Sequence, residues 1–437
     1  MSVPDVDGSA LECCRSMPDP LPQAYLLGGP VLAGRIKERP EDFLVDELPL
    51  YEPCGSGEHL YLGVQKTNMP HGELLQVLSR HYDVGLGDIG FAGMKDKVGV
   101  TRQAISLHLP GRADPQPPQH ERLAVLWQAR HTNKLRRGHL AGNRFSIRIR
   151  GVEPTAAPLV WRGLRRLAVT GVPDSFGPQR FGYRRNNHRM GWLLLKERWE
   201  DAIAELVGSK GSWHPPHQET QRRLADQGRW AESLPLWSRA DGAERAALRA
   251  LASGRDARRA CMAIDPDNRQ FWISALQSAI FNRVVDARLG NGTFATLGEG
   301  DVALQHHNGA VFQVGPEALA DATPEKALAG RLERFEISPS GPLPGPGMVE
   351  PRGSVAALES EAAAAYHSDA ALFASGLVAG ARRPLRVRVS NPEIDAGFDE
   401  HGPFVRTAFD LPKGAYATVL LREIVGDASA AAADEGH

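Results

Sequence analysis

Short segments of the chain alternate between apolar and polar residues, which is the pattern of β-strands with one buried face. Residues 143–150 show it most clearly, because Phe145, Ile147 and Ile149 are apolar and the residues between them are polar. The same alternation marks residues 60–64, 105–109 and 385–389. The sequence therefore predicts strands within the first 175 residues and again near the C-terminus.

Apolar residues at three- and four-residue spacing dominate the middle of the chain and predict helices. The clearest helical stretch covers residues 271–289, and a broad apolar stripe covers residues 192–207. An earlier helix is predicted from Pro70 to Tyr82. Residues 338–354 are dense in Pro and Gly, so they are predicted to form a loop.

This order of elements predicts one strand-rich domain that is interrupted by a mostly helical insertion. The strand-rich domain comprises residues 23–175 and 381–425, and the insertion comprises residues 176–380. Residues 1–22 and 426–437 lack a periodic apolar pattern, so both ends are predicted to be flexible tails.

Composition is that of a water-soluble globular protein with more than one domain. The 51 basic and 52 acidic residues give a formal net charge of -1, so any nucleic-acid surface must be a local patch. The four cysteines have neither the number nor the spacing of a disulfide framework or a zinc site. No signal peptide and no long apolar run is present, and we expect a cytoplasmic protein that does not span a membrane.

Two stretches of the chain are rich in basic residues and contain no acidic residue, namely residues 122–152 and 175–196. Arginine clusters suit phosphate groups, because the guanidinium group makes forked, charge-assisted hydrogen bonds. A solvated surface without a ligand is the alternative. The candidate RNA-binding residues are Lys134, Arg136, Arg137, Arg144 and Arg148.

A glycine-bounded loop places Lys95, Asp96 and Lys97 directly before a predicted strand. Aspartate has an ordinary pKa of about 3.9 and is ionised at neutral pH, and flanking cations lower that pKa further. Asp96 is therefore suited to act as a nucleophile or a general base rather than as a general acid. A plain turn is the alternative for this tripeptide.

Six segments resemble, in the same order, the motifs of the TruD family of tRNA pseudouridine synthases. Asp174 departs from the family pattern, which usually has Asn there, and residues 207–262 look longer than in compact members. The segments are RIKERPEDF at 35–43, GFAGMKDKVGVTRQ from residue 90, KLRRGHLAGNRF at 134–145, VPDSFGPQRFG at 172–182, FWISALQSAIFN at 271–282 and DLPKGAYATVLLREI at 410–424.

The resemblance implies an α+β fold, in which a pseudouridine synthase catalytic domain with a mixed, largely antiparallel sheet is interrupted by a mainly helical inserted TRUD domain. The implied activity is the isomerisation of uridine, at position 13 of tRNA, to pseudouridine. It implies tRNA as the partner and no cofactor. We expect no metal site, no protein partner and a monomer. A non-catalytic RNA-binding factor and a synthase for another RNA remain alternatives.

The resemblance also assigns roles to single residues. Asp96 matches the catalytic aspartate of the family. Phe145 matches its active-site aromatic residue, which can stack on a base but has no proton to exchange; plain core packing is the alternative. Two further positions match the family site: Lys37 as a charge partner of Asp96, with a solvated lysine as the alternative, and Phe43 as a pocket wall, with a buried strand residue as the alternative. Asn143 lies two residues from Phe145 on the same strand face and is a candidate partner of the uracil edge or of the Asp96 loop. Arg180 is a candidate phosphate ligand or a brace of the inserted domain.

Overall fold

The computed structural model describes residues 8–95 and 97–427, and the chain divides into two compact units. The sheet unit comprises Tyr25–Asp174 and Val387–His437. The helical unit comprises Met1–Ala24 and Ser175–Arg386. Among the described residues, 8–24 are grouped with the helical unit.

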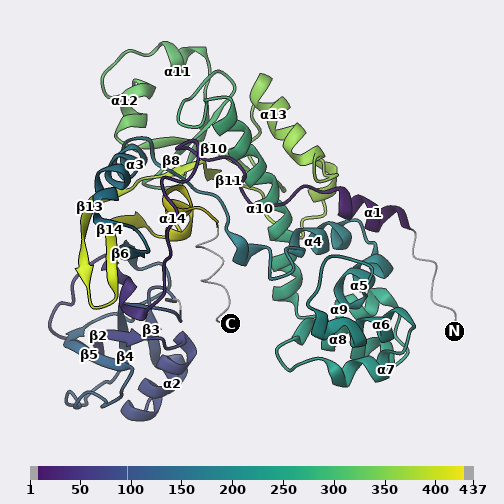
Figure 1. Cartoon of the computed structure of the whole chain (residues 1–437), viewed down its shortest axis with the longest axis horizontal. Coiled ribbons are helices and arrows are strands. Elements are labelled where there is room, and N and C mark those ends of the chain that lie inside the picture. The colour runs from purple at the N-terminus through teal and green to yellow at the C-terminus, as the bar shows by residue number, and fades with distance from the viewer. Residues whose placement is uncertain (1–7, 96, 428–437) are drawn as a thin grey trace. The chain divides into compact units, whose positions relative to one another are not determined.

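The sheet unit is built on one eight-stranded sheet (Figure 1). Its strands are β1 (Phe43–Pro49), β2 (His59–Thr67), β3 (Ile89–Phe91), β4 (Val100–His108), β5 (Leu123–His131), β6 (Leu140–Arg150), β13 (Ser390–Asp399) and β14 (Gly402–Pro412). They follow the order β13-β14-β6-β1-β4-β2-β5, and β3 pairs with β4. The pair β1–β4 is parallel and the other pairs are antiparallel. The predicted α+β fold with a mixed, largely antiparallel sheet is confirmed.

One face of this sheet, here called the covered face, packs against three helices. These helices are α2 (His71–Tyr82), α3 (Ala157–Thr170) and α14 (Ala417–Val425). Strand pairing places Val45, Phe145 and Phe409 side by side on the covered face, where α3 and α14 bury them. Leu62 and Ile105 are paired farther across the same face, where α2 buries them in a second core. Figure 1 shows α2 beside β3 and β4, and α3 beside β13.

A buried ion-pair network joins β6 to the start of β1 and the end of β13. The Arg150 guanidinium donates to Asp42 Oδ1 at 2.6 and 3.0 Å and to the two carboxylate oxygens of Asp399 at 2.7 and 2.8 Å. Arg150 and Asp42 are both buried. Hydrogen bonding to Arg150 lowers the pKa of Asp399 from 3.8 to about 2. Breaking a buried pair by removing one partner typically costs about 3–5 kcal/mol.

The substitution Asp399→Asn is expected to lower the free energy of unfolding at neutral pH, by a margin that shrinks in acid. Because the folded-state pKa of Asp399 is depressed, its carboxylate stabilises the fold fully above its ordinary pKa of 3.8, and this contribution is lost as the pH falls through about 2. Urea unfolding of both proteins at about pH 7, 5 and 3 measures the margin. Asp395→Asn is the matched control on β13, because its partner Arg406 forms an exposed pair of little worth. If the difference in unfolding free energy between the unaltered protein and Asp399→Asn grew toward low pH, the stabilising role of the ionised Asp399 carboxylate would be refuted.

The helical unit is organised around α10 (Pro266–Gly290), which packs against several neighbouring elements. Its start is fixed by Pro266 at the first helical position and by Asp265, whose carboxylate accepts a hydrogen bond from the backbone of Asp267 at 2.8 Å. The predicted apolar stripe, including Leu276 and Ile280, is buried. The other helices are α1 (Gly8–Ser16), α4 (Asn187–Leu195), α5 (Trp199–Val207), α6 (Glu219–Asp226), α7 (Trp230–Ser233), α8 (Gly242–Ala252), α9 (Ala257–Met262), α11 (Pro316–Ala320), α12 (Leu328–Glu333) and α13 (Gly353–Ala364).

A second, four-stranded sheet lies in the helical unit and runs in the order β11-β10-β8-β9. Its strands are β8 (Val302–Gln305), β9 (Val311–Gln313), β10 (Ile337–Leu343) and β11 (Ala381–Pro384), and the remaining strands of the chain are β7 (Val172–Pro173) and β12 (Arg386–Val387). Strand β10 corrects the prediction of a loop over residues 338–354. Proline lacks the backbone N–H that a strand normally donates to its neighbour. Strand β10 pairs with β8 through its first residues and with β11 through its last. Neither edge of β10 therefore needs hydrogen bonds along its whole length.

The prediction of a flexible N-terminal tail is wrong from residue 8 onward. Gly8–Ser16 forms α1, and Leu11, Cys14 and Met17 are buried at helical spacing. The first seven residues of the predicted tail, and residues 428–437 of the C-terminal one, lie outside the described residues. The predicted helical stripe at 192–207 is also two helices, because the chain turns between α4 and α5 at Glu197, which has a φ of 55°.

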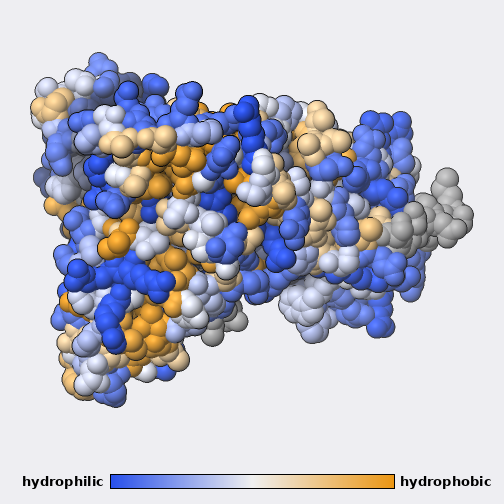
Figure 2. Space-filling view, turned by 90° about the horizontal axis from the view of Figure 1, so that it is seen from above, coloured by the Kyte–Doolittle hydropathy of each residue, from blue (hydrophilic) through white to orange (hydrophobic). Residues whose placement is uncertain are grey.

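The surface shows hydrophobic residues in patches between hydrophilic ones on the face seen in Figure 2. Within the described part of the chain, no helix combines the length and apolar character needed to cross a membrane. Across those same residues, no three His, Cys, Asp or Glu side chains form a group that could hold a metal ion.

Candidate active site

Polar side chains interrupt the covered face between its two apolar cores. Strand pairing places Lys66 beside Thr101, and Glu47 beside Asn143. Gln103 comes two residues after Thr101 on β4 and therefore faces the same side. Lys66, Thr101 and Gln103 are buried. We call these five residues the polar stripe; an apolar core does not need such residues, so they mark a candidate site.

The segment between β3 and β4 is anchored to the polar stripe, and it contains Asp96. The Lys66 ammonium donates to the carbonyl oxygen of Met69 at 2.6 Å and to that of Lys95 at 3.3 Å. Lys95 Nζ lies 2.7 Å from Glu47 Oε2, and these two side chains are 6% and 4% exposed. Asp96 itself lies outside the described residues, but the residue before it is held on both its backbone and its side chain.

Asn68 holds the other end of this segment. Its backbone N–H donates to the carbonyl of Gly99, and its side-chain oxygen accepts from the N–H of Gly99, both at 3.0 Å. Gly99 has a φ of 111°, and a Cβ there would lie 2.5 Å from the carbonyl oxygen of Phe43, so only glycine fits. The turn between β2 and α2 therefore fixes the chain on both sides of position 96.

Glu47 fills a gap at the edge of β4. Strands β1 and β3 both pair with this edge, β1 at residues 100–102 and β3 at residues 105–107. Between them, Glu47 Oε1 accepts a hydrogen bond from the backbone N–H of Ala104 at 3.2 Å. One carboxylate thus continues the strand ladder and also binds Lys95, which couples the sheet to the segment that contains Asp96.

Three phenylalanine rings adjoin the polar stripe. Phe145 stacks on Phe409 with ring centroids 5.6 Å apart and meets Phe43 edge-on at 6.4 Å. All three rings are buried, and the Lys37 ammonium lies 4.3 Å from the centroid of Phe43. The structure therefore brings together four of the substrate-binding residues predicted from the sequence, because Asn143 lies on the same face two residues before Phe145.

Several buried atoms of the polar stripe have no hydrogen-bond partner within the described residues. They are Thr101 Oγ1, the amide oxygen and nitrogen of Gln103, and Asn143 Oδ1. An unsatisfied buried polar atom costs about 1–3 kcal/mol. Such groups are expected where a ligand completes the hydrogen bonding. The polar stripe is therefore suited to a ligand with both donors and acceptors.

Three basic residues in or near the polar stripe act on the ring of His71. The His71 ring lies 4.5 Å from the ring of Phe91. Burial, and then the charges of Lys66, Lys95 and Arg137, lower the pKa of His71 to about 4. His71 is therefore neutral at physiological pH, and the same cations favour a negatively charged group in their neighbourhood.

The loop between β5 and β6 presents basic side chains next to the same segment. Its Gly138 N–H donates to the carbonyl of Ala92 at 2.8 Å, which fixes the loop beside the end of β3. The Lys134 ammonium donates a hydrogen bond to the carbonyl oxygen of Gly87, whereas Arg136 and Arg137 are exposed. Arg136 and Arg137 are thus placed to meet a phosphate group near the candidate site.

The arginines of β6 lie on the opposite face of the sheet from Phe145, because side chains alternate along a strand. Arg144 pairs with Asp410 at 2.8 Å, and Arg148 lies 3.7 Å from Asp399. The acidic residues missing from the local sequence are thus supplied by β13 and β14. The structure does not bring Arg144 and Arg148 together with the polar stripe, and RNA binding by them remains a prediction.

Arg180 belongs to the helical unit. It donates to Ser274 Oγ at 3.2 Å, and its guanidinium lies 5.0 Å and 5.1 Å from the ring centroids of Phe176 and Phe271. These contacts connect residues 176–180 to α10, and both expected roles of Arg180, as a phosphate ligand and as a brace of the inserted domain, remain predictions.

Sequence reasoning missed several residues of the site, although a readable pattern existed for some. Lys66 continues the apolar series of β2, and Thr101 and Gln103 continue that of β4, so each is polar at a position where alternation demands an apolar residue. Glu47 and Phe409 gave no comparable pattern, because their roles depend on pairing with distant strands.

The fold and the site together define the class of protein. A mixed, largely antiparallel sheet that is interrupted in sequence by a mainly helical unit is the architecture that the resemblance implied for a pseudouridine synthase. Residues 22–424 match the family model described as tRNA pseudouridine synthase D (TruD). The chain belongs to the TruD family.

Relatives with that description cover nearly the whole chain. The tRNA pseudouridine synthase D of Geobacter sulfurreducens is 41% identical over 400 residues, which are 91% of this chain and 95% of that protein. The one of Geobacter metallireducens is 39% identical over 411 residues, which are 92% and 97% of the two chains. The crystal structure named for TruD of Methanosarcina mazei has a TM-score of 0.79 at 24% identity and covers 98% of this chain and 99% of its own. That likeness shows the shared fold.

Proposed function

We propose that this protein isomerises uridine to pseudouridine in tRNA, at position 13, with Asp96 as the catalytic aspartate. The observation that carries the proposal is the anchoring of the chain on both sides of position 96, by Lys66 and Asn68, beside the polar stripe. Membership of the TruD family supports the reaction type. The proposed domain roles follow: the sheet unit is the catalytic domain, and the helical unit is the inserted TRUD domain.

The reaction requires no external reactant. The bond between C1′ of the ribose and N1 of uracil breaks, the base turns, and C1′ bonds to C5 instead. C5 then loses its proton and N1 gains one, so atoms and electrons balance within the nucleoside. A carboxylate suits this chemistry because it can trap or stabilise the electron-poor sugar carbon, as in retaining glycosidases.

The polar stripe and the phenylalanine rings are proposed to hold the uracil base. A stacked uridine must be turned out of the RNA at a cost of a few kcal/mol, and an aromatic wall compensates part of this cost. Phe145 and Phe43 are proposed as that wall, with Lys37 as a charge partner of Asp96. Asn143 and Gln103 each carry polar atoms without partners in the described chain, and these are suited to the donors and acceptors of the uracil edge.

The proposed partner is tRNA, and the proposed form is a cytoplasmic monomer without a cofactor. Arg136 and Arg137 support the RNA partner, because their exposed guanidinium groups adjoin the anchored segment. An unmodified tRNA transcript incubated with the protein, followed by carbodiimide treatment and reverse transcription, tests the function. A stop one nucleotide 3′ of position 13, which reports pseudouridine at position 13, is expected. A stop elsewhere would move the activity to another site, and no stop would contradict the proposal.

The double substitution of Arg136 and Arg137 by Ala is expected to weaken tRNA binding and to flatten its dependence on salt. Each lost phosphate contact should reduce the slope of log K against log salt concentration by about 0.7–0.9. Filter binding at several salt concentrations measures both quantities. The matched control replaces the exposed Arg162 and Arg165 of α3, which removes the same charge. If both double variants lost the same tRNA affinity, the effect would come from the change in net charge and not from the position of Arg136 and Arg137.

A further inference from the structure

Two exposed aromatic side chains share one region of the helical unit. Trp213 is 65% exposed and Tyr183 is 58% exposed. They belong to one region because Arg184, the neighbour of Tyr183 in sequence, donates from Nε to the carbonyl oxygen of Trp213 at 3.0 Å. We call Tyr183 and Trp213, with the loop of residues 208–214, the aromatic surface.

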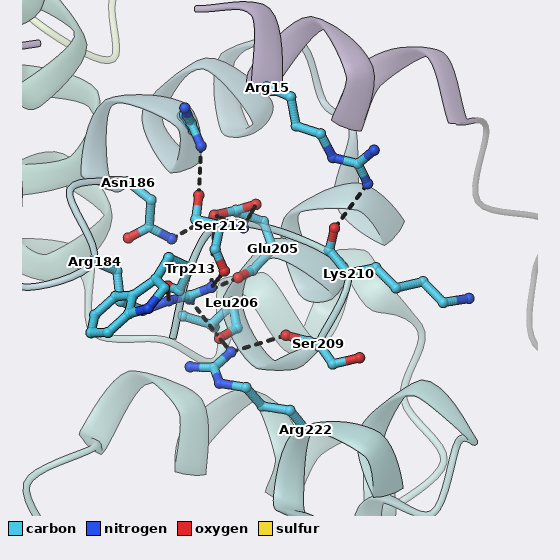
Figure 3. A network of polar contacts seen from close by, with 12 residues as sticks. Arg15, Arg184, Asn186, Glu205, Leu206, Ser209, Lys210, Ser212, Trp213 and Arg222 are labelled. Carbon is cyan, nitrogen blue, oxygen red and sulfur yellow. Dashed lines mark hydrogen bonds and ion pairs between the residues drawn. The ribbon is translucent and has the colours of Figure 1, made fainter. Parts of the chain in front are cut away.

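A buried arginine fixes the loop under Trp213 (Figure 3). Besides the Trp213 carbonyl, Arg184 binds the carbonyl oxygens of Ser212 at 3.1 Å and Glu205 at 2.9 Å. The Glu205 carboxylate in turn accepts a hydrogen bond from the backbone N–H of Ser212 at 3.1 Å. Arg15 binds the carbonyl of Lys210 at 2.9 Å. The backbone of this exposed loop is therefore held from below at several points.

A second buried arginine connects this loop to Tyr183. Arg222 donates to the carbonyl oxygens of Leu206 at 3.0 Å and Gly208 at 3.1 Å. It also donates to Gln218 Oε1 at 2.8 Å, and the amide of Gln218 donates to the Tyr183 hydroxyl at 3.1 Å. Figure 3 shows Arg222 beside the part of this network that holds the Trp213 loop. Both aromatic residues are thus fixed through one network while their side chains stay exposed.

Burying the charged side chains of Arg184 and Arg222 costs free energy, which a surface without a binding partner would not need. Burial lowers the pKa of Arg184 and brings that of Arg222 to about 10, which reflects the penalty of removing guanidinium groups from water. The bonds formed in return order the backbone of a loop that exposes an indole ring. A rigid aromatic side chain loses little conformational entropy on binding, so such a loop is preorganised for recognition.

The surroundings favour a nucleotide over an apolar protein surface. Two exposed basic residues belong to the same segments, Lys210 in the loop that leads to Trp213 and Arg185 two residues after Tyr183, where it also pairs with Asp19 at 3.2 Å. The partly exposed Ser209 and the exposed His217 add polar groups. Isolated aromatic rings among cationic and polar side chains are typical of single-stranded nucleic-acid binding, in which bases stack on the rings and cations meet the phosphates. Protein interfaces instead surround their aromatic residues with a continuous apolar core.

We propose that the aromatic surface binds an unpaired nucleotide of the tRNA substrate, by stacking its base on Trp213, the more exposed of the two rings. This nucleotide is a different one from the uridine that reacts. The inference rests on the proposed function for the identity of the RNA. It assigns to the helical unit a contact that selects tRNA by an unstacked base, whereas the polar stripe selects the reacting uracil.

The test compares Trp213→Ala with Trp213→Phe, which keeps a stacking ring, and with Leu236→Ala as a control at another exposed position of the same unit. Trp213→Ala is expected to raise the Kd for tRNA and the KM by about tenfold, with little change in kcat. Trp213→Phe should recover most of the affinity, and Leu236→Ala should match the unaltered protein. Thermal unfolding of each variant checks that the fold is kept.

The outcomes separate this inference from the proposed function. An unchanged Kd for Trp213→Ala would overturn the aromatic surface as an RNA site, even if pseudouridine still forms. A raised Kd that Trp213→Phe does not recover, or a lowered unfolding temperature, would assign the residue a structural role and also overturn the inference. Failure of the unaltered protein to form pseudouridine would overturn the function, while the tRNA affinities of the variants would still measure the contact.

Discussion

Replacing Asp96 by Asn is expected to abolish pseudouridine formation while tRNA binding is kept. An amide has nearly the same shape as the carboxylate but cannot stabilise or trap the electron-poor sugar carbon and cannot take a proton. Loss of a group that acts directly in the chemistry lowers the rate by about a thousandfold or more. Single-turnover conversion of a tRNA transcript, read by the carbodiimide stop, measures this rate.

The neighbouring lysine provides the control for this experiment. Lys97→Met changes the charge of the same segment without removing a carboxylate, so it should alter the rate far less than Asp96→Asn. Filter binding with tRNA separates a loss of chemistry from a loss of affinity. Conversion by Asp96→Asn at the normal rate would exclude Asp96 from catalysis and would leave the family assignment in place.

Replacing Lys66 by Met is expected to lower kcat by about 10- to 100-fold with little change in the Kd for tRNA. Lys66 is buried and donates to the carbonyl oxygens of Met69 and Lys95, so it fixes the residue directly before Asp96. Displacement of a reacting group by about 1 Å can cost about a hundredfold in rate. Lys66 is thus a positioning residue, and kcat under saturating tRNA is the quantity to measure.

Two variants of Asn68 test the same positioning role without removing a buried charge, in case Lys66→Met does not fold. Asn68→Gly keeps a residue that tolerates the φ of 48° but removes the oxygen that accepts the Gly99 N–H, whereas Asn68→Asp keeps that oxygen. We expect a loss of kcat for the glycine variant and near-normal kcat for the aspartate variant, at similar unfolding temperatures. Equal activity of all three proteins would refute the idea that this turn sets the position of the segment.

Much of the fold could be predicted from local patterns. The alternation in residues 143–150 has the period of a strand, and it became β6, while the helical spacing after Phe271 became most of α10. Local reasoning failed where the deciding contacts are distant. Strand β10 tolerates its prolines only because two different partners share its length, and α1 depends on burial of residues such as Cys14 within the helical unit.

The candidate site divides in the same way. The motif around Asp96 could be found from the sequence because its residues are contiguous, and Phe145 followed from the same resemblance. The arginines of β6 show the opposite case, because their acidic partners Asp399 and Asp410 are more than 200 residues away in sequence. Those partners turn arginines of the acid-free stretch 122–152 into ion pairs. The polar stripe needed the register of β1, β2, β4 and β6 before its members could be recognised as neighbours.

The most direct test of the proposed activity is a map of pseudouridine in total tRNA from cells that lack this protein. We expect that the modification at position 13 disappears, that the unaltered gene restores it, and that a gene encoding Asp96→Asn does not. Pseudouridine that persists at position 13 in those cells, or that is lost only from another RNA, would refute the proposed activity.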